Sequence, residues 1–154
     1  MFPFKTILCP TDFSEPSREA LQIAEKFARH FSAKIHLVHV ITPVPLAVPT
    51  TGAVAIDFPA YQKEMEKSAR ESLEKTVVEA FGEDADVETS VLVGEAADEI
   101  VRFADEKGLD LILLATHGYT GWRHLVFGSV AEKVIRLSKK PVLTIREPED
   151  DTAG

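Results

Sequence analysis

The segment from Ala115 to Ser129 has residue types and a spacing suited to holding a phosphate group. It follows the most apolar run of the chain, with Gly118 near its start and Gly128 where a helix is expected to begin. A helix start offers unpaired backbone amides that bind anions, and Ser129 adds a hydroxyl. The two glycines either let the backbone approach a ligand closely or serve only turns. The residues alone leave both interpretations open.

A second polar group follows the first apolar run, which ends at Pro10. Ser14 has the chemistry of a helix N-cap, and Pro16 stands in the first turn that would follow it. Asp12 lies just before this cap. It is either a helix-entry residue that caps backbone amides or a member of a ligand site at the end of the strand. Both roles stay open.

The other reactive side chains match no common metal or catalytic motif. The five histidines lack the HExxH spacing, and His36 and His39, three apart on a predicted strand, point to opposite faces. His117 either orients a phosphate or ribose or makes simple loop hydrogen bonds. Cys9, the single cysteine, is expected in the core and excludes an internal disulfide. P-loop, Gly-x-Gly-x2-Gly and Gly-x-Ser-x-Gly patterns are also missing from the sequence.

Strand and helix patterns alternate along the chain and must position these residues. Apolar runs typical of strands occupy residues 5–10, 35–41, 87–93, 111–115 and 141–145. Helical spacing of apolar residues covers 20–31, 61–80, 97–104 and 130–137. This alternation predicts one doubly wound α/β domain with a parallel sheet and helices on both faces. Ligands bind such folds at the carboxyl ends of the strands, here 10–14, 38–42 and 114–129.

Length, charge and composition narrow the class of protein. The chain has 154 residues, 45% of them hydrophobic, and a formal net charge of −8. This acidic balance argues against nucleic-acid binding, and no apolar run reaches the roughly 20 residues that membrane insertion needs. The start lacks the pattern of a signal peptide, so a cytoplasmic location is expected. We predict a single domain over residues 1–147 and an acidic flexible tail over 148–154.

Three separated motifs resemble the universal stress protein family. The ATP-binding members of that family carry Gly-x2-Gly-x9-Gly-Ser/Thr, and this chain has Ala115-x2-Gly118-x9-Gly128-Ser129 followed by Pro141-Val142-Leu143. Ile7–Ser14 is similar to the first strand and turn of the family, and Leu37–Val40 is similar to the end of the family's second strand. Ala115 replaces the first glycine of the motif. An alanine there costs on the order of 1 kcal/mol if the position needs positive φ, and otherwise only narrows the site.

The resemblance implies a five-stranded parallel sheet of order 3-2-1-4-5 and an adenine-nucleotide pocket between strands one and four. It implies that base and ribose lie along Pro10, Thr11 and Asp12, and that the adenine edge meets the backbone of Val40. It implies a ribose and phosphate wall made by Leu114, Ala115, His117 and Gly118. It implies a phosphate cradle of backbone amides and one hydroxyl at Gly128, Ser129, Val130 and Ala131.

The resemblance further implies a stress-response signalling or regulatory module that binds ATP, with Mg or Mn held mostly by the nucleotide. It implies a homodimer that is paired through the edge strand Val142–Ile145. An unknown protein partner can also bind the module. Because no catalytic lysine follows the phosphate segment, ATP hydrolysis is expected to be slow or absent. The alternatives are a nucleotide-free dimeric interaction module and a slow ATPase. Arg123 either assists the phosphates, or the cluster of Trp122, Arg123 and His124 presents a partner surface or forms a solvated loop tip.

Overall fold

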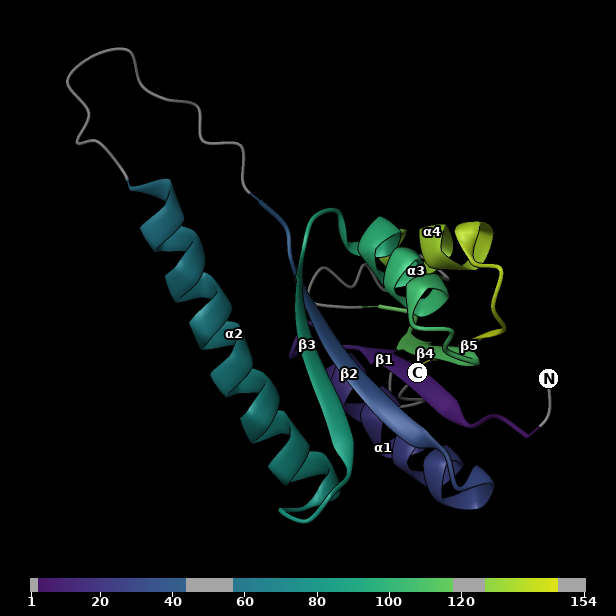
Figure 1. The fold of residues 1–154 in the computed structure, drawn as a ribbon. Coiled ribbons are helices and arrows are strands. Elements are labelled where there is room, and N and C mark those ends of the chain that lie inside the picture. The colour runs from purple at the N-terminus through teal and green to yellow at the C-terminus, as the bar shows by residue number, and fades with distance from the viewer. Residues whose placement is uncertain (1–2, 44–56, 118–126, 147–154) are drawn as a thin grey trace, which may run out of the picture.

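The computed structural model describes residues 3–43, 57–117 and 127–146. Strands and helices alternate along these ranges, as the sequence predicts (Figure 1). The elements are β1 (Thr6–Pro10), α1 (Glu15–Phe31), β2 (Lys34–Ile41), α2 (Phe58–Phe81), β3 (Val87–Val93), α3 (Ala96–Glu106), β4 (Leu111–Ala115), α4 (Ser129–Leu137) and β5 (Val142–Ile145). The strand bounds differ from the predicted runs by one residue at most.

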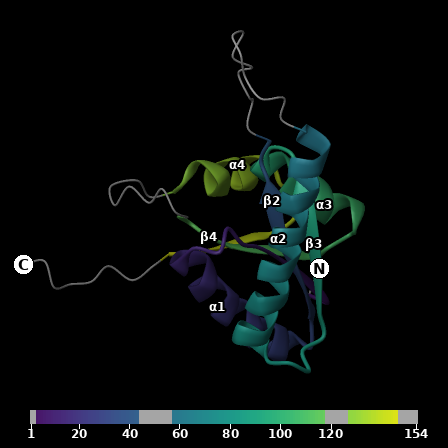
Figure 2. The same cartoon turned by 90° about the vertical axis from the view of Figure 1, so that its left-hand side faces the viewer.

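The strands form one parallel sheet of order β3-β2-β1-β4-β5. Helices α1 and α2 cover one face, and α3 and α4 cover the other (Figures 1 and 2). The predicted doubly wound α/β fold and its strand order are confirmed. The chain crosses from one side of β1 to the other between β3 and β4, so β1 and β4 send their following helices to opposite faces.

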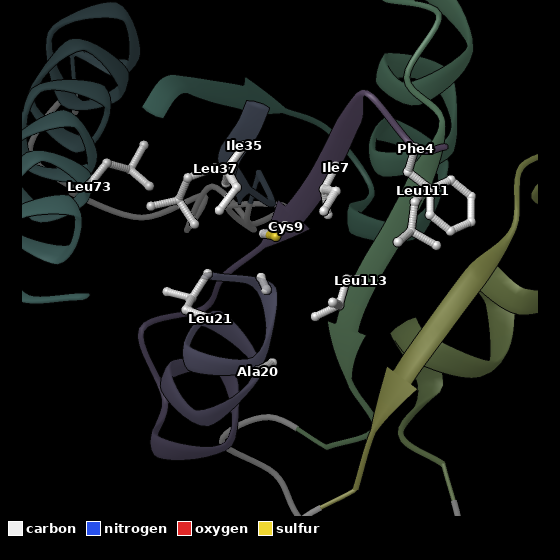
Figure 3. Close-up of a cluster of buried hydrophobic side chains, with 11 residues drawn as sticks. Phe4, Ile7, Cys9, Ala20, Leu21, Ile35, Leu37, Leu73, Leu111 and Leu113 are labelled. Carbon is white, nitrogen blue, oxygen red and sulfur yellow. The ribbon is translucent and has the colours of Figure 1, made fainter. Parts of the chain in front are cut away.

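Strand β1 is buried from both sides because its side chains alternate between two cores. Ile7 and Cys9 pack with α1 and α2, whereas Leu8 packs with α3 and α4 (Figure 3). This two-sided burial explains why the run is continuously apolar. Burial raises the pKa of the Cys9 thiol well above its ordinary value, which keeps the thiol protonated. The prediction that Cys9 is a core residue is confirmed.

Helix α2 corrects one expectation from the sequence. Its apolar spacing predicts a buried face that includes Tyr61 and Met65, yet these side chains are 55% and 40% exposed. The buried residues of the helix begin only at Ala69. With 24 residues the helix is roughly 36 Å long, whereas the seven residues of β3 beneath it span roughly 23 Å. The first turns of α2 therefore have no sheet to pack against.

Helix α4 supplies a second correction. Val134 is buried and Val130 packs against the core as predicted, but Leu137 is 40% exposed. The helix lies beside α3 at the β5 edge of the sheet. Among the described residues no further element lies beyond this edge, so the last turn of α4 stays uncovered. None of the described helices has the length and apolar character needed to cross a membrane.

The amino ends of β1 and β4 are joined by the carboxylate of Asp110. Its Oδ2 accepts the backbone N–H of Lys5 at 2.9 Å, the N–H of Thr6 at 3.0 Å and the hydroxyl of Thr6 at 3.0 Å. The N–H of Asp110 donates in return to Thr6 Oγ1 at 3.1 Å. Burial alone would raise the pKa of Asp110, but these hydrogen bonds outweigh it and lower the pKa below its ordinary value.

Candidate functional site

A pocket of about 240 Å³ lies at the carboxyl ends of β1 and β4, where the order of the strands reverses. The start of α4 and parts of α1 and α3 complete its walls. The lining residues are Pro10, Thr11, Asp12, Ser17, His39, Val40, Ala96, Ile100, Leu114, Ala115, Thr116, His117, Gly128, Ser129, Val130 and Ala131. This is the position in which open α/β sheets bind their ligands.

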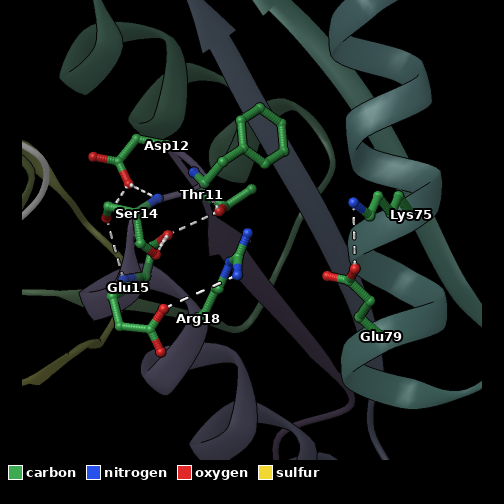
Figure 4. A network of polar contacts seen from close by, with 9 residues as sticks. Thr11, Asp12, Ser14, Glu15, Arg18, Lys75 and Glu79 are labelled. Atoms are coloured by element: carbon green, nitrogen blue, oxygen red, sulfur yellow. Dashed lines mark hydrogen bonds and ion pairs between the residues drawn. The ribbon is translucent and has the colours of Figure 1, made fainter.

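The turn from β1 into α1 is held by a chain of hydroxyl groups with a defined direction (Figure 4). Thr11 is buried just beyond β1, and its Oγ1 accepts the N–H of Phe13 at 3.0 Å. The same oxygen lies 3.0 Å from Ser17 Oγ. Because Ser17 donates its one hydroxyl hydrogen to the Ser14 carbonyl at 2.9 Å, Thr11 must be the donor to Ser17. The turn therefore has a fixed geometry beside the pocket.

Asp12 lines the pocket and also organises the start of α1. Its Oδ1 accepts the N–H of Ser14 at 3.0 Å and, in a short contact, the Ser14 hydroxyl (Figure 4). Ser14 is the N-cap of α1, and its Oγ accepts the N–H of Ser17 at 3.4 Å. The capping role considered for Asp12 is confirmed. That role leaves the carboxylate at the border of the pocket, so the two interpretations do not exclude each other.

Two aromatic rings support this turn from the α1 side of the sheet. Phe13 has a φ of 64°, a left-handed conformation that is rare for a bulky residue. Its ring packs on that of His39, with centroids 4.6 Å apart and planes tilted by 32°. His39 Nδ1 lies 2.8 Å from the carbonyl oxygen of Thr11. A strained backbone of this kind persists only where its surroundings hold it, and it often marks a functional site.

The end of β4 forms the opposite wall of the pocket. Thr116 follows the strand, is buried, and donates its N–H to the Ile145 carbonyl at 2.9 Å. Its hydroxyl lies 3.0 Å from His117 Nδ1, so a loop hydrogen bond, one of the roles considered for His117, is present. Ala115 is the last residue of β4, and its φ is not in the left-handed region. Alanine therefore adopts this backbone without strain, and its effect is limited to the space that its methyl group takes.

Helix α4 begins against this wall. Gly128 is its N-cap and makes no side-chain capping bond, while its own N–H donates to the Thr116 carbonyl at 2.6 Å. A Cβ at Gly128 would stand 3.0 Å from that carbonyl oxygen, so only glycine allows this close approach without displacement. The first-turn amides of Ser129, Val130 and Ala131 have no partner within the helix. They border the pocket and carry the positive end of the helix dipole.

The described lining residues include no lysine or arginine. The nearby Lys133 of α4 is held by the carboxylates of Glu95, the N-cap of α3, and of Asp98 in its first turn, with Nζ 3.0 Å from both. These contacts raise the pKa of Lys133. The pKa of Glu95 is lowered, first by the N–H of Asp98 and then by Lys133. Among the residues that the structure describes, backbone amides would therefore be the chief partners of an anion in the pocket.

The structure brings together eleven of the twelve site residues that the resemblance implies. Gly118 lies outside the described residues, as do Trp122, Arg123 and His124. Five further residues line the pocket and are not among the twelve, although two of them fall in the predicted ligand-binding ranges 38–42 and 114–129: Ser17, His39, Ala96, Ile100 and Thr116. His39 carried a signal, because it stands beside Val40 in a recognised motif. Ser17 and Ile100 carried none, because which helix residues reach the pocket depends on how the helices pack.

Comparisons with known proteins agree on a single family. The family model described as "Universal stress protein family" matches residues 3–146. Universal stress protein MJ0531 of Methanocaldococcus jannaschii is 33% identical over 149 residues, which cover 96% of this chain and 85% of that protein. The solved structure of MJ0577, from the same organism, is 31% identical with a TM-score of 0.79, and covers 95% of this chain and 98% of its own.

A second similar structure contains a nucleotide. It is the universal stress protein from Archaeoglobus fulgidus in complex with dAMP, which is 26% identical with a TM-score of 0.54. The match covers 94% of this chain and 99% of that one. The family model spans nearly the whole chain and the relatives match over almost their full lengths. The chain therefore belongs to the universal stress protein family.

Proposed function

We propose that this protein binds an adenine nucleotide in the pocket between β1 and β4, with ATP as its ligand, and acts as a regulatory module. The observation that carries the proposal is the start of α4. There, the absence of a side chain at Gly128 lets the helix start pack closely against the Thr116 carbonyl, and the first-turn amides, which have no partner within the helix, border a cavity. A helix N-terminus of this kind binds phosphate through its amides and dipole. The dAMP complex of the Archaeoglobus fulgidus relative supports an adenine nucleotide as the ligand.

The backbone of Val40 suits the edge of an adenine base. In a parallel strand the N–H and C=O of one residue point to the same side, and successive residues alternate. The Val38 carbonyl faces β1, since it accepts from Thr11, and the Ile41 carbonyl faces β3, since it accepts from Gly94. The polar groups of Val40 therefore face β1, beyond the end of that strand. A donor beside an acceptor matches N1 and the 6-amino group of adenine and mismatches the reversed edge of guanine.

The phosphates would be held at α4 by the amides of its first turn and by the Ser129 hydroxyl. Mg or Mn would accompany them. Asp12 is the one carboxylate among the described lining residues, and no group of three metal-ligating side chains occurs in the described ranges. The phosphate oxygens would therefore supply most of the ligands of the ion. This arrangement fits nucleotide binding with slow or absent hydrolysis.

We further propose that the protein works as a homodimer joined at β5. This strand pairs with β4 on one side and lies at the edge of the sheet. Beside it, Ile135 and Leu137 of α4 expose 43% and 40% of their surface. Pairing of two copies would cover both features. Sedimentation velocity should find a dimer for the wild type and a monomer for Leu137→Glu; a wild-type monomer at high concentration would contradict the dimer.

The proposed binding is tested by thermal unfolding with increasing ATP and magnesium, after assaying the purified protein for bound nucleotide. At 100 times the dissociation constant, a ligand adds about 2.7 kcal/mol, which raises Tm by several degrees for a domain of this size. The rise should saturate and should be missing in a folded Gly128→Val variant. No shift at millimolar ATP, together with no copurified nucleotide, would overturn the proposal.

One observation favours a second candidate, a nucleotide-free interaction module. The methyl group of Ala115 lies in the pocket wall where ATP-binding members of the family have glycine. An Ala115→Gly variant separates the two candidates. It should bind ATP only slightly more tightly if the pocket is functional, and should acquire binding that the wild type lacks if the methyl closes the site. Product formation that is lost in Asp12→Asn or Ser129→Ala would instead identify a slow ATPase.

A further inference from the structure

We propose that His39 is a positioning residue that keeps the backbone amide of Val40 available to the nucleotide base. The inference rests on the proposed function, because it assigns a role toward the adenine edge. It goes beyond that function by naming a side chain that prepares the site indirectly. His39 binds the Thr11 carbonyl and thereby affects the Val40 amide, which would bind the base. The hydrogen-bond pattern where β1 ends beside β2 assigns this role.

The ladder between β1 and β2 predicts where the Val40 amide would go if the strands continued. Pro10 lies opposite Val38, and the N–H of Thr11 donates to the Val38 carbonyl at 2.8 Å. In a parallel ladder, a residue that donates to one position accepts from the residue two positions further along the partner strand. The Thr11 carbonyl is therefore the acceptor that the Val40 amide would meet next.

The side chain of His39 takes that acceptor. Its Nδ1 lies 2.8 Å from the Thr11 carbonyl oxygen. A carbonyl only accepts, so Nδ1 carries the hydrogen. Within the described ranges, no backbone hydrogen bond joins Val40 to Thr11. The imidazole thus ends the ladder one bond early, and the Val40 amide remains directed into the pocket that Val40 lines.

The imidazole is itself held in place. The ring of Phe13 packs on it, and the left-handed backbone of Phe13 is fixed by its N–H bond to Thr11 Oγ1. Thr11 is fixed in turn by its bond to Ser17. The carbonyl, the imidazole and the supporting turn therefore form one connected unit.

The test compares two amide side chains that imitate different nitrogens of the imidazole. His39→Asn places an N–H near the position of Nδ1, whereas His39→Gln places it near that of Nε2. His39→Phe keeps a ring against Phe13 and has no donor. If the donor at Nδ1 is what matters, Asn should preserve the wild-type behaviour and both Gln and Phe should lose it. The Asn and Gln pair decides the question even if the Phe variant fails to fold.

The first readout is amide hydrogen exchange in nucleotide-free protein, which does not depend on binding. In the wild type and His39→Asn, the Val40 amide should exchange much faster than the Val38 amide, because no backbone group in the described ranges accepts it. In His39→Gln and His39→Phe, the released Thr11 carbonyl should accept the Val40 N–H and slow its exchange at least tenfold. A protected Val40 amide in the wild type would overturn the inference.

The second readout is affinity for adenosine, AMP and ATP. His39→Gln and His39→Phe should weaken all three by about the same factor, near tenfold for one hydrogen bond, because the change lies at the base. Affinity for pyrophosphate should not change, and His39→Asn should stay within threefold of the wild type. Equal losses for Asn and Gln would overturn the role of the donor. A wild type that binds no adenine nucleotide would overturn the proposed function, whereas the exchange pattern would still decide whether His39 holds the carbonyl.

Discussion

Strand β1 carries a polar cluster at each end, and the two clusters use their hydrogen bonds differently. At the amino end, the carboxylate of Asp110 accepts the backbone amides of Lys5 and Thr6 directly. At the carboxyl end, polar side chains such as Thr11 and Ser17 bond to one another and to the turn. The amides at the start of α4 are left facing a pocket. We call the amino end closed, because its amides are already bound and tie the strands together. We call the carboxyl end open, because it retains amide donors for a ligand.

The comparison predicts that the largest effect on binding comes from a substitution that blocks the start of α4 at the open end. Gly128→Val should lower nucleotide affinity by about a hundredfold, because the new side chain meets the Thr116 carbonyl at 3.0 Å and displaces the start of α4. Calorimetric titration of the folded variant measures this. Gly108→Ala is the matched control, since Gly108 has a φ of 62° and open space around it. It should cost about 1 kcal/mol of stability and leave affinity unchanged.

The closed end should show the opposite behaviour. Asp110→Ala removes an acceptor of three hydrogen bonds, and we expect a loss of about 2 kcal/mol in the free energy of unfolding. Denaturant unfolding measures this loss. Because Asp110 lies at the other end of the sheet, nucleotide affinity should stay within twofold of the wild type. A large loss of affinity in a stable Asp110→Ala protein would show that the two ends are coupled.

The same carboxylate predicts a dependence on pH. Hydrogen bonds lower the pKa of Asp110 in the folded protein below its ordinary value of 3.8. A lowered pKa means that the stabilisation is complete above the unfolded value and is lost as pH falls through the folded one. The stability difference between wild type and Asp110→Ala should therefore be constant near neutral pH and shrink below about pH 3.8. A difference that grows on acidification would contradict the assignment.

Thr6 and Thr11, which stand at opposite ends of β1, give a matched pair of substitutions with the smallest expected effects. Thr6→Val and Thr11→Val each remove one hydroxyl without changing the shape of the side chain, and each should cost about 1 kcal/mol of stability. Only Thr11→Val should also weaken nucleotide binding, by a few-fold, because it releases the turn beside the pocket. Equal affinities for the two variants would mean that the turn does not position the site.

The local sequence pattern predicts the fold because each helix and strand is determined mainly by residues that are close together in the sequence. The alternating strands and helices and the cap at Ser14 depend on residues a few positions apart, and the structure has them as predicted. Exposure of Tyr61 and Leu137 depends on where the sheet ends beneath a helix, which no local window contains. For the same reason, the sequence places His39 in the predicted ligand-binding range 38–42 but indicates no role for its side chain. Its role arises from the register of β2 against β1, and register is a property of two strands.

The most direct test of the account is to follow the backbone amide resonances during titration with ATP and magnesium. The account predicts saturable shifts at Val40, Ser129, Val130 and Ala131, which border the pocket. The amides of Lys5 and Thr6, which are held by Asp110, should not move. Titration with GTP should leave Val40 unshifted. Unchanged pocket resonances at millimolar ATP, or shifts that centre on Lys5 and Thr6, would contradict the claim that the open end of the sheet binds adenine nucleotides.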